Sequence, residues 1–371
     1  MTDRRAREVV IVGAGGMGGA WMDTVVRRDD LRIAAVADIV PDAARAAARA
    51  RGLDVPCVAT ASDALAAVHA DLLINVTIPQ AHLDVSATAV RAGVPVLSEK
   101  PVTPTVAEAL VLASLSDATG VLVATSQSRR HSDGIRAFRD ALAELGSAEQ
   151  LDARFFQNPR FGGFRDEMAS PLLVDMAIHT FDQARYLLDA EPESVYCEEF
   201  SPSWSWYRGD AAAQAVFRFA DGRRFAYSGS WCADGLTTSW NGQWRGTAPG
   251  GSAVWDGEGE VIAQRAGDEP RARPLRSAAE GLDAALDEFV AALDGGPPPS
   301  GEIHRNVHSL AMVEAAVDSS ASGRPVRLDD LFEASLLRAV ALARGRGDAD
   351  AVAVLESGGS VSRGDGPARL S

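Results

Sequence analysis

The sequence predicts an α/β protein with a doubly wound parallel sheet in its first third and a second α+β domain built on a mainly antiparallel sheet. Short apolar runs alternate with alanine-rich helical segments up to about residue 126, which is typical of a parallel sheet covered by helices. Residues 194–261 are instead rich in tryptophan, tyrosine, phenylalanine and glycine, as in antiparallel strands. A chain of 371 residues is also long enough for two domains.

The predicted elements of the first domain follow from this alternation. Each expected strand is a short apolar run that a sheet buried on both faces would contain. Each expected helix has apolar residues at helical spacing. The strands are expected at 8–12, 31–37, 72–76, 94–98 and 121–125, and the helices at 17–27, 41–51, 82–92 and 105–118.

The second domain is expected to begin with a polar helix and a strand, and then a helix that carries several ionisable residues. A Gly-Gly-Pro-Pro-Pro turn at 295–299 separates two returning helices. The expected elements are helices at 132–145, 172–188, 278–293 and 304–320 and a strand at 150–157. We therefore predict a dinucleotide-binding domain at 1–126, a substrate-binding and oligomerisation domain at 127–330, and a helix remnant with a disordered tail at 331–371.

The composition excludes several classes of partner. A formal net charge of -15 repels nucleic acid and anionic lipid, so a small neutral substrate is the better expectation. The three cysteines have no CxxC spacing, which indicates neither a disulfide framework nor a zinc site, and favours a reducing cytoplasm. His304 and His308 lie four residues apart but have no third ligand nearby, so we expect no metal. We expect neither a signal peptide nor a membrane-spanning helix, because no apolar run has the length that either needs.

A glycine-rich turn follows the first predicted strand. Its first glycine allows a tight turn, the second lets the backbone approach a pyrophosphate, and the third permits close helix packing. The helix that follows would direct its N-terminus at the anion. The turn is formed by Gly13, Ala14, Gly15, Gly16, Met17 and Gly18.

An acidic residue at the end of the second strand supports a dinucleotide site. Asp38 lies 20 residues after Gly18, where a carboxylate accepts hydrogen bonds from the adenosine ribose. The same charge repels a 2′-phosphate, and Ile39 stands where a phosphate-binding residue would be expected. The sequence therefore predicts NAD as the cofactor in preference to NADP.

Two segments predict acid-base chemistry. Lys100 follows the strand at 94–98, at the edge of the sheet where ligands bind, and so can reach both nicotinamide ribose and substrate. Asp175, His179 and Asp182 are spaced by four and seven residues, which places them on one face of an α-helix. Histidine is suited to take the proton from an alcohol, Asp175 could hold the imidazole or a substrate hydroxyl, and Asp182 could bind another hydroxyl.

Taken together, these motifs resemble the glucose-fructose oxidoreductase, inositol dehydrogenase and rhizopine catabolism (Gfo/Idh/MocA) family. The resemblance covers about residues 8–328. It departs from the family pattern in the approach to the catalytic helix, where residues 169–173 replace a glycine-rich segment and Ala177 replaces a glycine, and at Ile78, which replaces a frequent second proline. The motifs are the glycine turn, Asp38, Thr77-Ile-Pro79-x-x-His82, Glu99-Lys100-Pro101 and Asp175-x-x-x-His179-x-x-Asp182.

The resemblance implies a Rossmann domain followed by a domain with a large open, mostly antiparallel sheet that often forms an oligomer interface. It further implies His179 as the acid-base residue, Lys100 as its helper and Asp175 as a positioning group. Thr77, Pro79 and His82 match the lining of the cofactor pocket, and Glu99 matches a residue near the nicotinamide. A homodimer or homotetramer is the expected assembly.

The residues that would bind the substrate belong to no single motif. Aromatic side chains concentrate at 204–255 and suit either the CH face of a sugar or packing within a sheet and against another subunit. Asn158, Arg160 and Arg165 could bind hydroxyls or an acidic group.

We expect an NAD-dependent dehydrogenase that oxidises a secondary hydroxyl of a sugar, cyclitol or glycoside. An alternative is a redox-neutral enzyme that retains NAD and oxidises a sugar only transiently, for elimination or glycoside cleavage. Another is a sensor of NAD and sugar without catalysis, which the intact set of acid-base residues disfavours.

Overall fold

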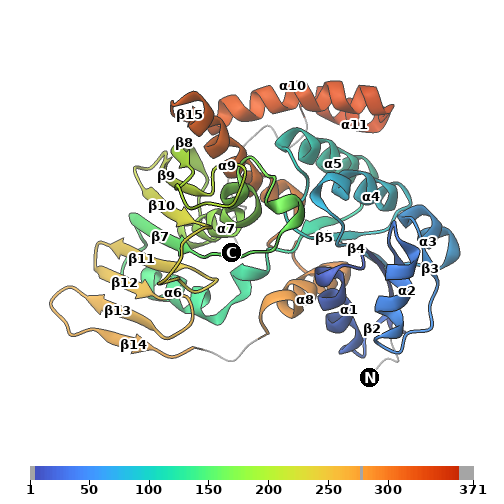
Figure 1. The fold of residues 1–371 in the computed structure, drawn as a ribbon, viewed down its shortest axis with the longest axis horizontal. Helices are drawn as coiled ribbons and strands as arrows, with labels where there is room; N and C mark the ends of the chain where they lie inside the picture. Colours follow the sequence, from blue (N-terminus) through green and yellow to red (C-terminus); the bar gives the residue numbers. More distant parts are fainter. Residues whose placement is uncertain (1–4, 276–278, 359–371) are drawn as a thin grey trace. The chain divides into compact units, whose positions relative to one another are not determined.

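A computed structural model of the chain describes residues 5–275 and 279–358 and is shown in Figure 1. The described residues form two compact units. The first contains residues 5–127, Leu282–Val307 and 334–358, and the second contains 128–275, 279–281 and His308–Glu333. Among the described helices, none combines the length and the apolar character needed to cross a membrane.

The first unit contains a parallel sheet with the strand order β3-β2-β1-β4-β5-β6. This is the order of a dinucleotide-binding Rossmann fold, whose ligand crevice lies where the strand order reverses, next to β1. The predicted parallel sheet is confirmed, and β3 is an addition too short to be recognised from its sequence pattern. The strands are β1 (Arg7–Val12), β2 (Leu31–Ala37), β3 (Cys57–Val58), β4 (Leu72–Asn75), β5 (Val96–Ser98) and β6 (Val123–Thr125).

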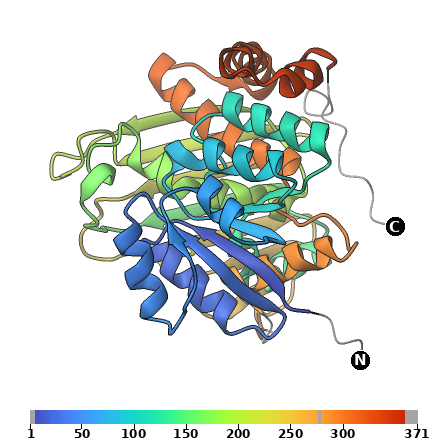
Figure 2. The same cartoon turned by 90° about the vertical axis from the view of Figure 1, so that its right-hand side faces the viewer.

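Helices cover this sheet, as the alanine-rich pattern predicts. Trp21 and Met22 of α1 are fully buried in one apolar cluster with β1, β2 and β4. Helices α4 and α5 pack side by side (Figure 2), and Thr105 and Glu108 form a capping box that fixes the start of α5. The helices of this part are α1 (Gly16–Val26), α2 (Pro41–Arg49), α3 (Ala61–Ala67), α4 (Pro79–Arg91) and α5 (Val106–Thr119).

Segments from the C-terminal third return to the first unit, unlike in the predicted division of the chain. Phe289 of α8 (Gly281–Leu293) is fully buried in the core cluster around β1, and Figure 1 shows α8 beside α1. Residues 349–356, expected in a disordered tail, form the helix α11 (Ala349–Glu356), which packs on α5. Ala351 and Leu355 are its buried residues, an apolar pair too short to stand out from its polar surroundings. Residues 359–371 of the expected tail lie outside the described residues.

The second unit is built on a nine-stranded sheet with the order β14-β13-β12-β11-β7-β10-β9-β8-β15. Neighbouring strands are antiparallel except for β7 and β10, which confirms the predicted mostly antiparallel sheet. The strands are β7 (Gln150–Phe156), β8 (Pro192–Phe200), β9 (Ala212–Phe219), β10 (Arg224–Ser230), β11 (Gln243–Ala248), β12 (Gly251–Trp255), β13 (Val261–Arg265), β14 (Arg271–Arg273) and β15 (Val326–Arg327).

An aromatic core fixes one helix of this unit on its sheet. Phe181 contacts the rings of Phe217, Phe225 and Tyr227 edge-on, with ring centroids 4.8, 6.1 and 5.3 Å apart. Phe181 belongs to α7 (Ile178–Leu188), so this contact holds the helix that carries His179. The remaining helical elements are η1 (Ser128–His131), α6 (Asp133–Glu144), η2 (Gly163–Arg165), η3 (Leu172–Ala177), α9 (Ile303–Ser322) and α10 (Leu328–Arg346), and the unit boundaries fall within α9 and α10.

Candidate active site

The glycine turn joins β1 to α1, and two of its glycines are required sterically. Gly13 has φ +110°, and a Cβ there would lie 2.4 Å from the carbonyl oxygen of Val76. A Cβ on Gly18 would lie 2.1 Å from the carbonyl oxygen of Gly13. A larger residue at position 13 would therefore push the turn away from the segment after β4, and one at position 18 would push α1 away from the turn.

The middle of the turn is open instead. A Cβ on Gly15 or Gly16 would meet no atom of the described chain within 4 Å. Gly15 caps α1 without a side chain, and the first turn of α1 contains no acidic residue. The N–H groups at this helix end are thus available to an anion, and the open backbone suits the close approach of a pyrophosphate.

Asp38 ties the turn to the end of β2. Its Oδ2 accepts a hydrogen bond of 2.8 Å from the N–H of Ala14, and its Oδ1 accepts one of 2.8 Å from Val40. A carboxylate has about four acceptor sites, so capacity remains for the two hydroxyls of a ribose. These features together fit NAD at the turn.

The segment after β4 lies at the carboxyl ends of the parallel strands, as the glycine turn does. The hydroxyl of Thr77 donates to Oδ1 of Asn75 at 2.7 Å, and Pro79 is the first residue of α4. His82 is only 1% exposed, and its ring nitrogens lie 2.6 Å from the carbonyl oxygen of Pro101 and 3.0 Å from that of Thr77. Burial lowers its pKa. His82 is expected to line the cofactor pocket, and in the structure its ring also connects the loop after β4 to the loop after β5.

Glu99 and Lys100 follow β5. Nε1 of the buried Trp21 donates to Oε1 of Glu99 at 2.8 Å, and burial raises the pKa of this carboxyl. The backbone N–H of Lys100 donates to Oε2 of Glu99 at 3.2 Å, and the Lys100–Pro101 peptide is cis. Glu99 thereby connects the start of the Lys100 loop to α1.

Lys100 is the only lysine of the chain, among 36 lysines and arginines. Arginine therefore serves wherever this protein needs only a basic surface group. An ammonium differs from a guanidinium because it is compact and can lose its proton when buried. Position 100 is therefore the one place in the sequence where a lysine stands instead of an arginine.

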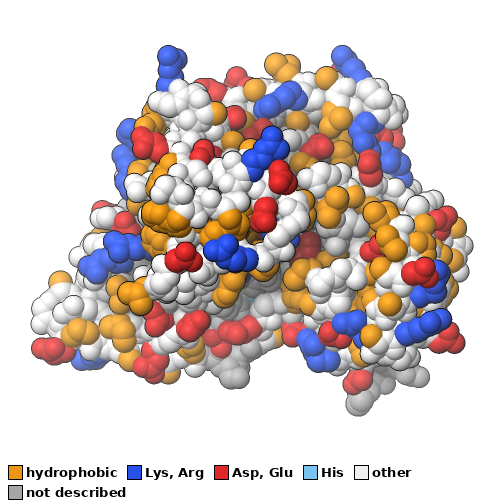
Figure 3. Space-filling view, viewed as in Figure 1, with side chains coloured by type: hydrophobic (Ala, Val, Ile, Leu, Met, Phe, Trp, Pro, Cys, Tyr) orange, Lys and Arg blue, Asp and Glu red, His pale blue; other side chains and the backbone are white. Residues whose placement is uncertain are grey.

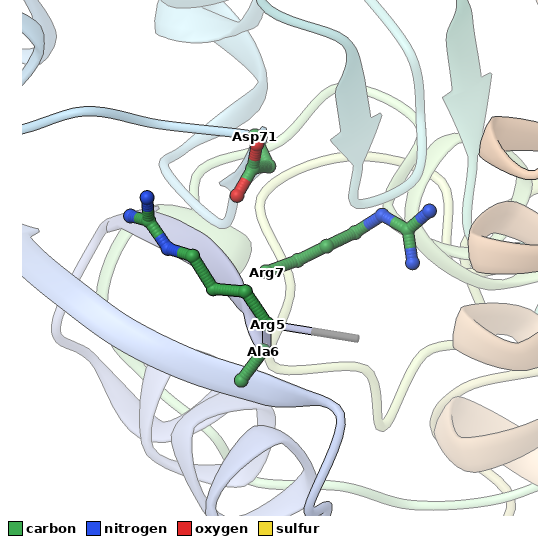
Figure 4. A pocket seen from close by; sticks show the side chains of 4 residues that line it. All are labelled: Arg5, Ala6, Arg7 and Asp71. Atoms are coloured by element: carbon green, nitrogen blue, oxygen red, sulfur yellow. The ribbon is translucent and has the colours of Figure 1, made fainter. Parts of the chain in front are cut away.

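A small pocket of the first unit lies at the other end of β1. It has a volume of about 170 Å³ and is lined by Arg5, Ala6, Arg7 and Asp71. Figure 4 shows the two arginine side chains diverging, with the carboxylate of Asp71 near Arg5. Arg5 pairs with Glu8, and Arg7 pairs with Asp294. Because ligands of such sheets bind at the carboxyl ends of the strands, this pocket is separate from the dinucleotide site.

In the second unit, Asp175 lies in a π-helical turn rather than in the predicted α-helix. The turn is η3, and α7 continues from it directly. Nε of Arg165 donates to Oδ2 of Asp175 at 2.6 Å. The π-helical turn changes the angle between residues four apart, so Asp175, His179 and Asp182 do not simply share one α-helical face. Such turns are frequent at functional sites.

His179 and Asp182 have different surroundings. His179 lies in the first turn of α7 and is 8% exposed. Asp182 is 1% exposed; Nε and Nη2 of Arg130 donate to it at 2.5 and 2.6 Å, and the hydroxyl of Ser309 donates at 2.6 Å. The expectation that Asp182 binds a substrate hydroxyl therefore gives way to a structural role, because its oxygens are buried and already bonded.

The loop between β7 and η3 contains the other predicted substrate residues. Asn158 donates to Oδ1 of Asp234 at 3.1 Å. The guanidinium of Arg160 lies 3.8 Å from the ring centroid of Trp206, and that of Arg165 lies 5.3 and 4.7 Å from the rings of Phe161 and Phe164. Among the tryptophans of this region, Trp231, Trp244 and Trp255 are buried in the unit, whereas Trp204 and Trp240 are exposed.

Two further residues of the second unit were missed from the sequence. Burial raises the pKa of Glu199 to about 7, and its Oε2 accepts a hydrogen bond of 3.0 Å from Ser170. Burial lowers the pKa of Arg129 to about 10. Neither residue belongs to a recognisable motif, so only the fold could reveal their surroundings.

The two histidines considered as a metal pair have separate partners. His304 contacts Glu302 and Asp117 at 2.6 and 3.0 Å. Burial opposes its charged form, but these carboxylates raise its pKa to about 9. Burial lowers the pKa of His308 to about 4. Within the described residues, no group of three or more histidine, cysteine or acidic side chains could hold a metal ion.

The sheet order, the open glycine turn and Asp38 define a dinucleotide-binding Rossmann fold. Residues 7–127 match the oxidoreductase family with an NAD-binding Rossmann fold, and residues 135–241 match the C-terminal domain of the same Gfo/Idh/MocA family. The chain belongs to the Gfo/Idh/MocA family of NAD-binding oxidoreductases.

Similar proteins extend this result over most of the chain. The rhizopine catabolism protein MocA of Rhizobium meliloti is 27% identical, covering 83% of this chain and 93% of its own length. Inositol 2-dehydrogenase of Rhizobium meliloti is 25% identical, with coverages of 86% and 98%. An oxidoreductase from Agrobacterium radiobacter, solved with NAD+, L-tartaric acid and magnesium, has a TM-score of 0.81 at 16% identity, with coverages of 88% and 99%.

Proposed function

We propose that this protein oxidises a secondary hydroxyl of a sugar or cyclitol, with Lys100, Asp175 and His179 acting on one substrate. The observation that carries the proposal is the junction of η3 and α7, which presents His179 directly after the turn that contains Asp175. The names of the relatives, inositol 2-dehydrogenase and rhizopine catabolism protein, support a polyhydroxylated small molecule.

Each residue has a role that its chemistry supports. The glycine turn and Asp38 would hold NAD, which would supply the hydride acceptor for the carbon that is oxidised. A ring nitrogen of His179 takes the hydroxyl proton, and the ammonium of Lys100 donates a hydrogen bond to the same oxygen as negative charge develops there. Asp175 accepts a hydrogen bond from the substrate, while Arg165 holds the carboxylate of Asp175 in place.

Replacement of the reacting groups tests the assignment. Lys100→Met or His179→Ala should reduce kcat by about 100-fold or more, because general acid-base catalysis contributes about 10²- to 10⁴-fold. NAD affinity should stay nearly unchanged. The measurement is reduced-nicotinamide absorbance with a panel of sugars, cyclitols and sugar acids, using NAD and NADP. His69→Ala, which removes an exposed histidine, is the matched control. Wild-type turnover in either active-site variant would refute the assignment, and turnover without net NADH release would favour a redox-neutral cycle.

The single lysine permits a second test. An amine-directed reagent can modify only Lys100 and the N-terminal amine. We expect modification of Lys100 to abolish turnover, and saturating substrate with NADH to protect it. Peptide mass spectrometry separates the two amines, so full activity with Lys100 modified would contradict its role.

We also propose that the chain forms a homo-oligomer through its nine-stranded sheet. Tyr196 and Val216 are paired across β8 and β9, yet are 39% and 46% exposed. Ile262 of β13 is 37% exposed. Apolar side chains on an exposed sheet face favour association. Light scattering should show a dimer or tetramer that Val216→Glu weakens, and a wild-type monomer at micromolar concentration would contradict this proposal.

A further inference from the structure

Arg129 is a charged side chain whose bonding is incomplete. It lies in η1, and a terminal amino group contacts the sulfur of Met176 at 3.9 Å. No carboxylate of the described residues pairs with it. A guanidinium has five N–H donors, and a thioether is a weak acceptor. Most of the hydrogen-bonding capacity of Arg129 is therefore unused within the described chain.

The neighbouring Arg130 differs from Arg129 in its bonding, because it forms an ion pair within the second unit. Arg130 donates two hydrogen bonds to the buried carboxylate of Asp182. Arg129 and Arg130 share a short helical turn, and only Arg130 has a carboxylate partner in this network. The difference indicates that Arg129 does not serve to stabilise the fold.

Arg129 is half-buried, and a partly desolvated cation without a counterion is costly. Burial lowers the pKa of Arg129 to about 10, which is the sign of a charge that the protein leaves uncompensated. Such perturbed groups concentrate at functional sites. The chain has a net charge of -15, and the face in Figure 3 intersperses basic with acidic side chains. No carboxylate of the described residues compensates the charge of Arg129, so an external anion is a suitable partner for it.

The position of Arg129 connects it to the candidate active site. Met176, which it contacts, is the residue directly after Asp175 in η3. The backbone carbonyl oxygen of Arg129 accepts a hydrogen bond of 3.2 Å from the side-chain amide of Gln183 in α7. Both the backbone and the side chain of Arg129 are therefore anchored to the helical segment that carries Asp175 and His179.

We propose that Arg129 binds an anionic group of the substrate, so that the substrate is an acidic sugar bearing a carboxylate or a phosphate. This inference rests on the proposed function and narrows its substrate class. It replaces the expectation of a neutral substrate that the net charge alone suggests. A planar guanidinium can form two parallel hydrogen bonds with either anion.

The test compares matched neutral and acidic sugars with wild type and Arg129→Gln. The pairs are D-glucose with D-glucuronate and D-glucose 6-phosphate, and D-galactose with D-galacturonate, at saturating NAD. We expect the wild type to prefer an acidic member, and Arg129→Gln to lower kcat/KM for that member by roughly 10- to 100-fold, as expected for a charged hydrogen bond. Arg129→Lys should recover part of the loss. The neutral member should change little, and Arg208→Gln, an exposed arginine paired with Glu167, is the control.

Several outcomes would overturn the inference. A wild-type preference for neutral members refutes it while leaving the proposed oxidation intact, and a loss of NAD affinity in Arg129→Gln would assign the residue to the cofactor. If no sugar is oxidised, the proposed function fails on this panel. Calorimetry with NADH-loaded enzyme then decides the inference separately, because failure of every acidic sugar to bind more tightly than its neutral partner would refute it.

Thermal unfolding supplies a readout that a structural role would move in the other direction. Because Arg129 has no carboxylate partner in the described chain, Arg129→Gln should melt at the wild-type temperature or above it. A marked drop in melting temperature would show that the residue supports the fold and would also overturn the inference.

Discussion

The two units hold their functional groups by different physical means. In the first unit, the glycine turn offers backbone N–H groups, and its shape depends on where a Cβ is forbidden. In the second unit, ion pairs between distant side chains fix the helix of Asp175 and His179. A binding site made of backbone N–H groups can therefore be predicted from a short stretch of sequence. A site made of side chains depends on which distant residues the fold brings together. Substitutions in the glycine turn and in the ion pairs of the second unit test this difference.

The largest stability effect is expected at Asp182. Asp182→Ala should lower the free energy of unfolding by about 3–5 kcal/mol, because it removes a buried carboxylate to which both Arg130 and Ser309 donate. The matched change is Asp175→Ala, whose partner Arg165 is one third exposed; it should cost about 1 kcal/mol or less but abolish most turnover. Urea unfolding and steady-state kinetics measure the two effects. A larger stability loss in Asp175→Ala would mean that the assigned roles are reversed.

An intermediate effect is expected in the glycine turn. Gly18→Ala should cost roughly 1–3 kcal/mol, because its Cβ would overlap the Gly13 carbonyl. Gly15→Ala should fold normally, since Gly15 has φ -71° and open space, but should weaken NAD binding about tenfold by blocking the pyrophosphate. Thermal melting and NADH fluorescence titration separate these outcomes. Equal NAD affinity in Gly15→Ala and wild type would argue against pyrophosphate at this turn.

The smallest effect is a pH dependence at Glu199. Its pKa is about 7 in the folded chain against an ordinary value of 4.5, so its contribution to stability is greatest below pH 4.5 and is lost as the pH rises through 7. Glu199→Gln should therefore be more stable than wild type at pH 8, by on the order of 1 kcal/mol, and not at pH 5. Melting temperatures between pH 5 and 8 test this, with the exposed Glu198→Gln as control. A pH-independent difference would show that Glu199 is not the titrating group.

Sequence periodicity predicted the strands of the first unit to within about two residues at each end, because each is a continuous apolar run. It missed β3, which has only two residues, and α11, whose buried residues are only two. Sequence periodicity also assigned α8 to the wrong unit, because the apolar face of a helix does not specify the sheet on which the helix packs. The spacing of Asp175, His179 and Asp182 assumed an α-helix, and no sequence signal revealed the π-helical turn.

The sequence by itself determined the cofactor side of this protein: the strand, the glycine turn, Asp38 and Lys100 are close in the chain or sit at predictable strand ends. Only the tertiary structure decided that His82 supports two loops, that Asp182 is a structural ion pair and that Arg129 has no counterion among the described residues. The physical reason is the separation in sequence between the residues that contact one another. Asp182 bonds to residues 52 and 127 positions away, and contacts at such separations are set by packing rather than by local pattern.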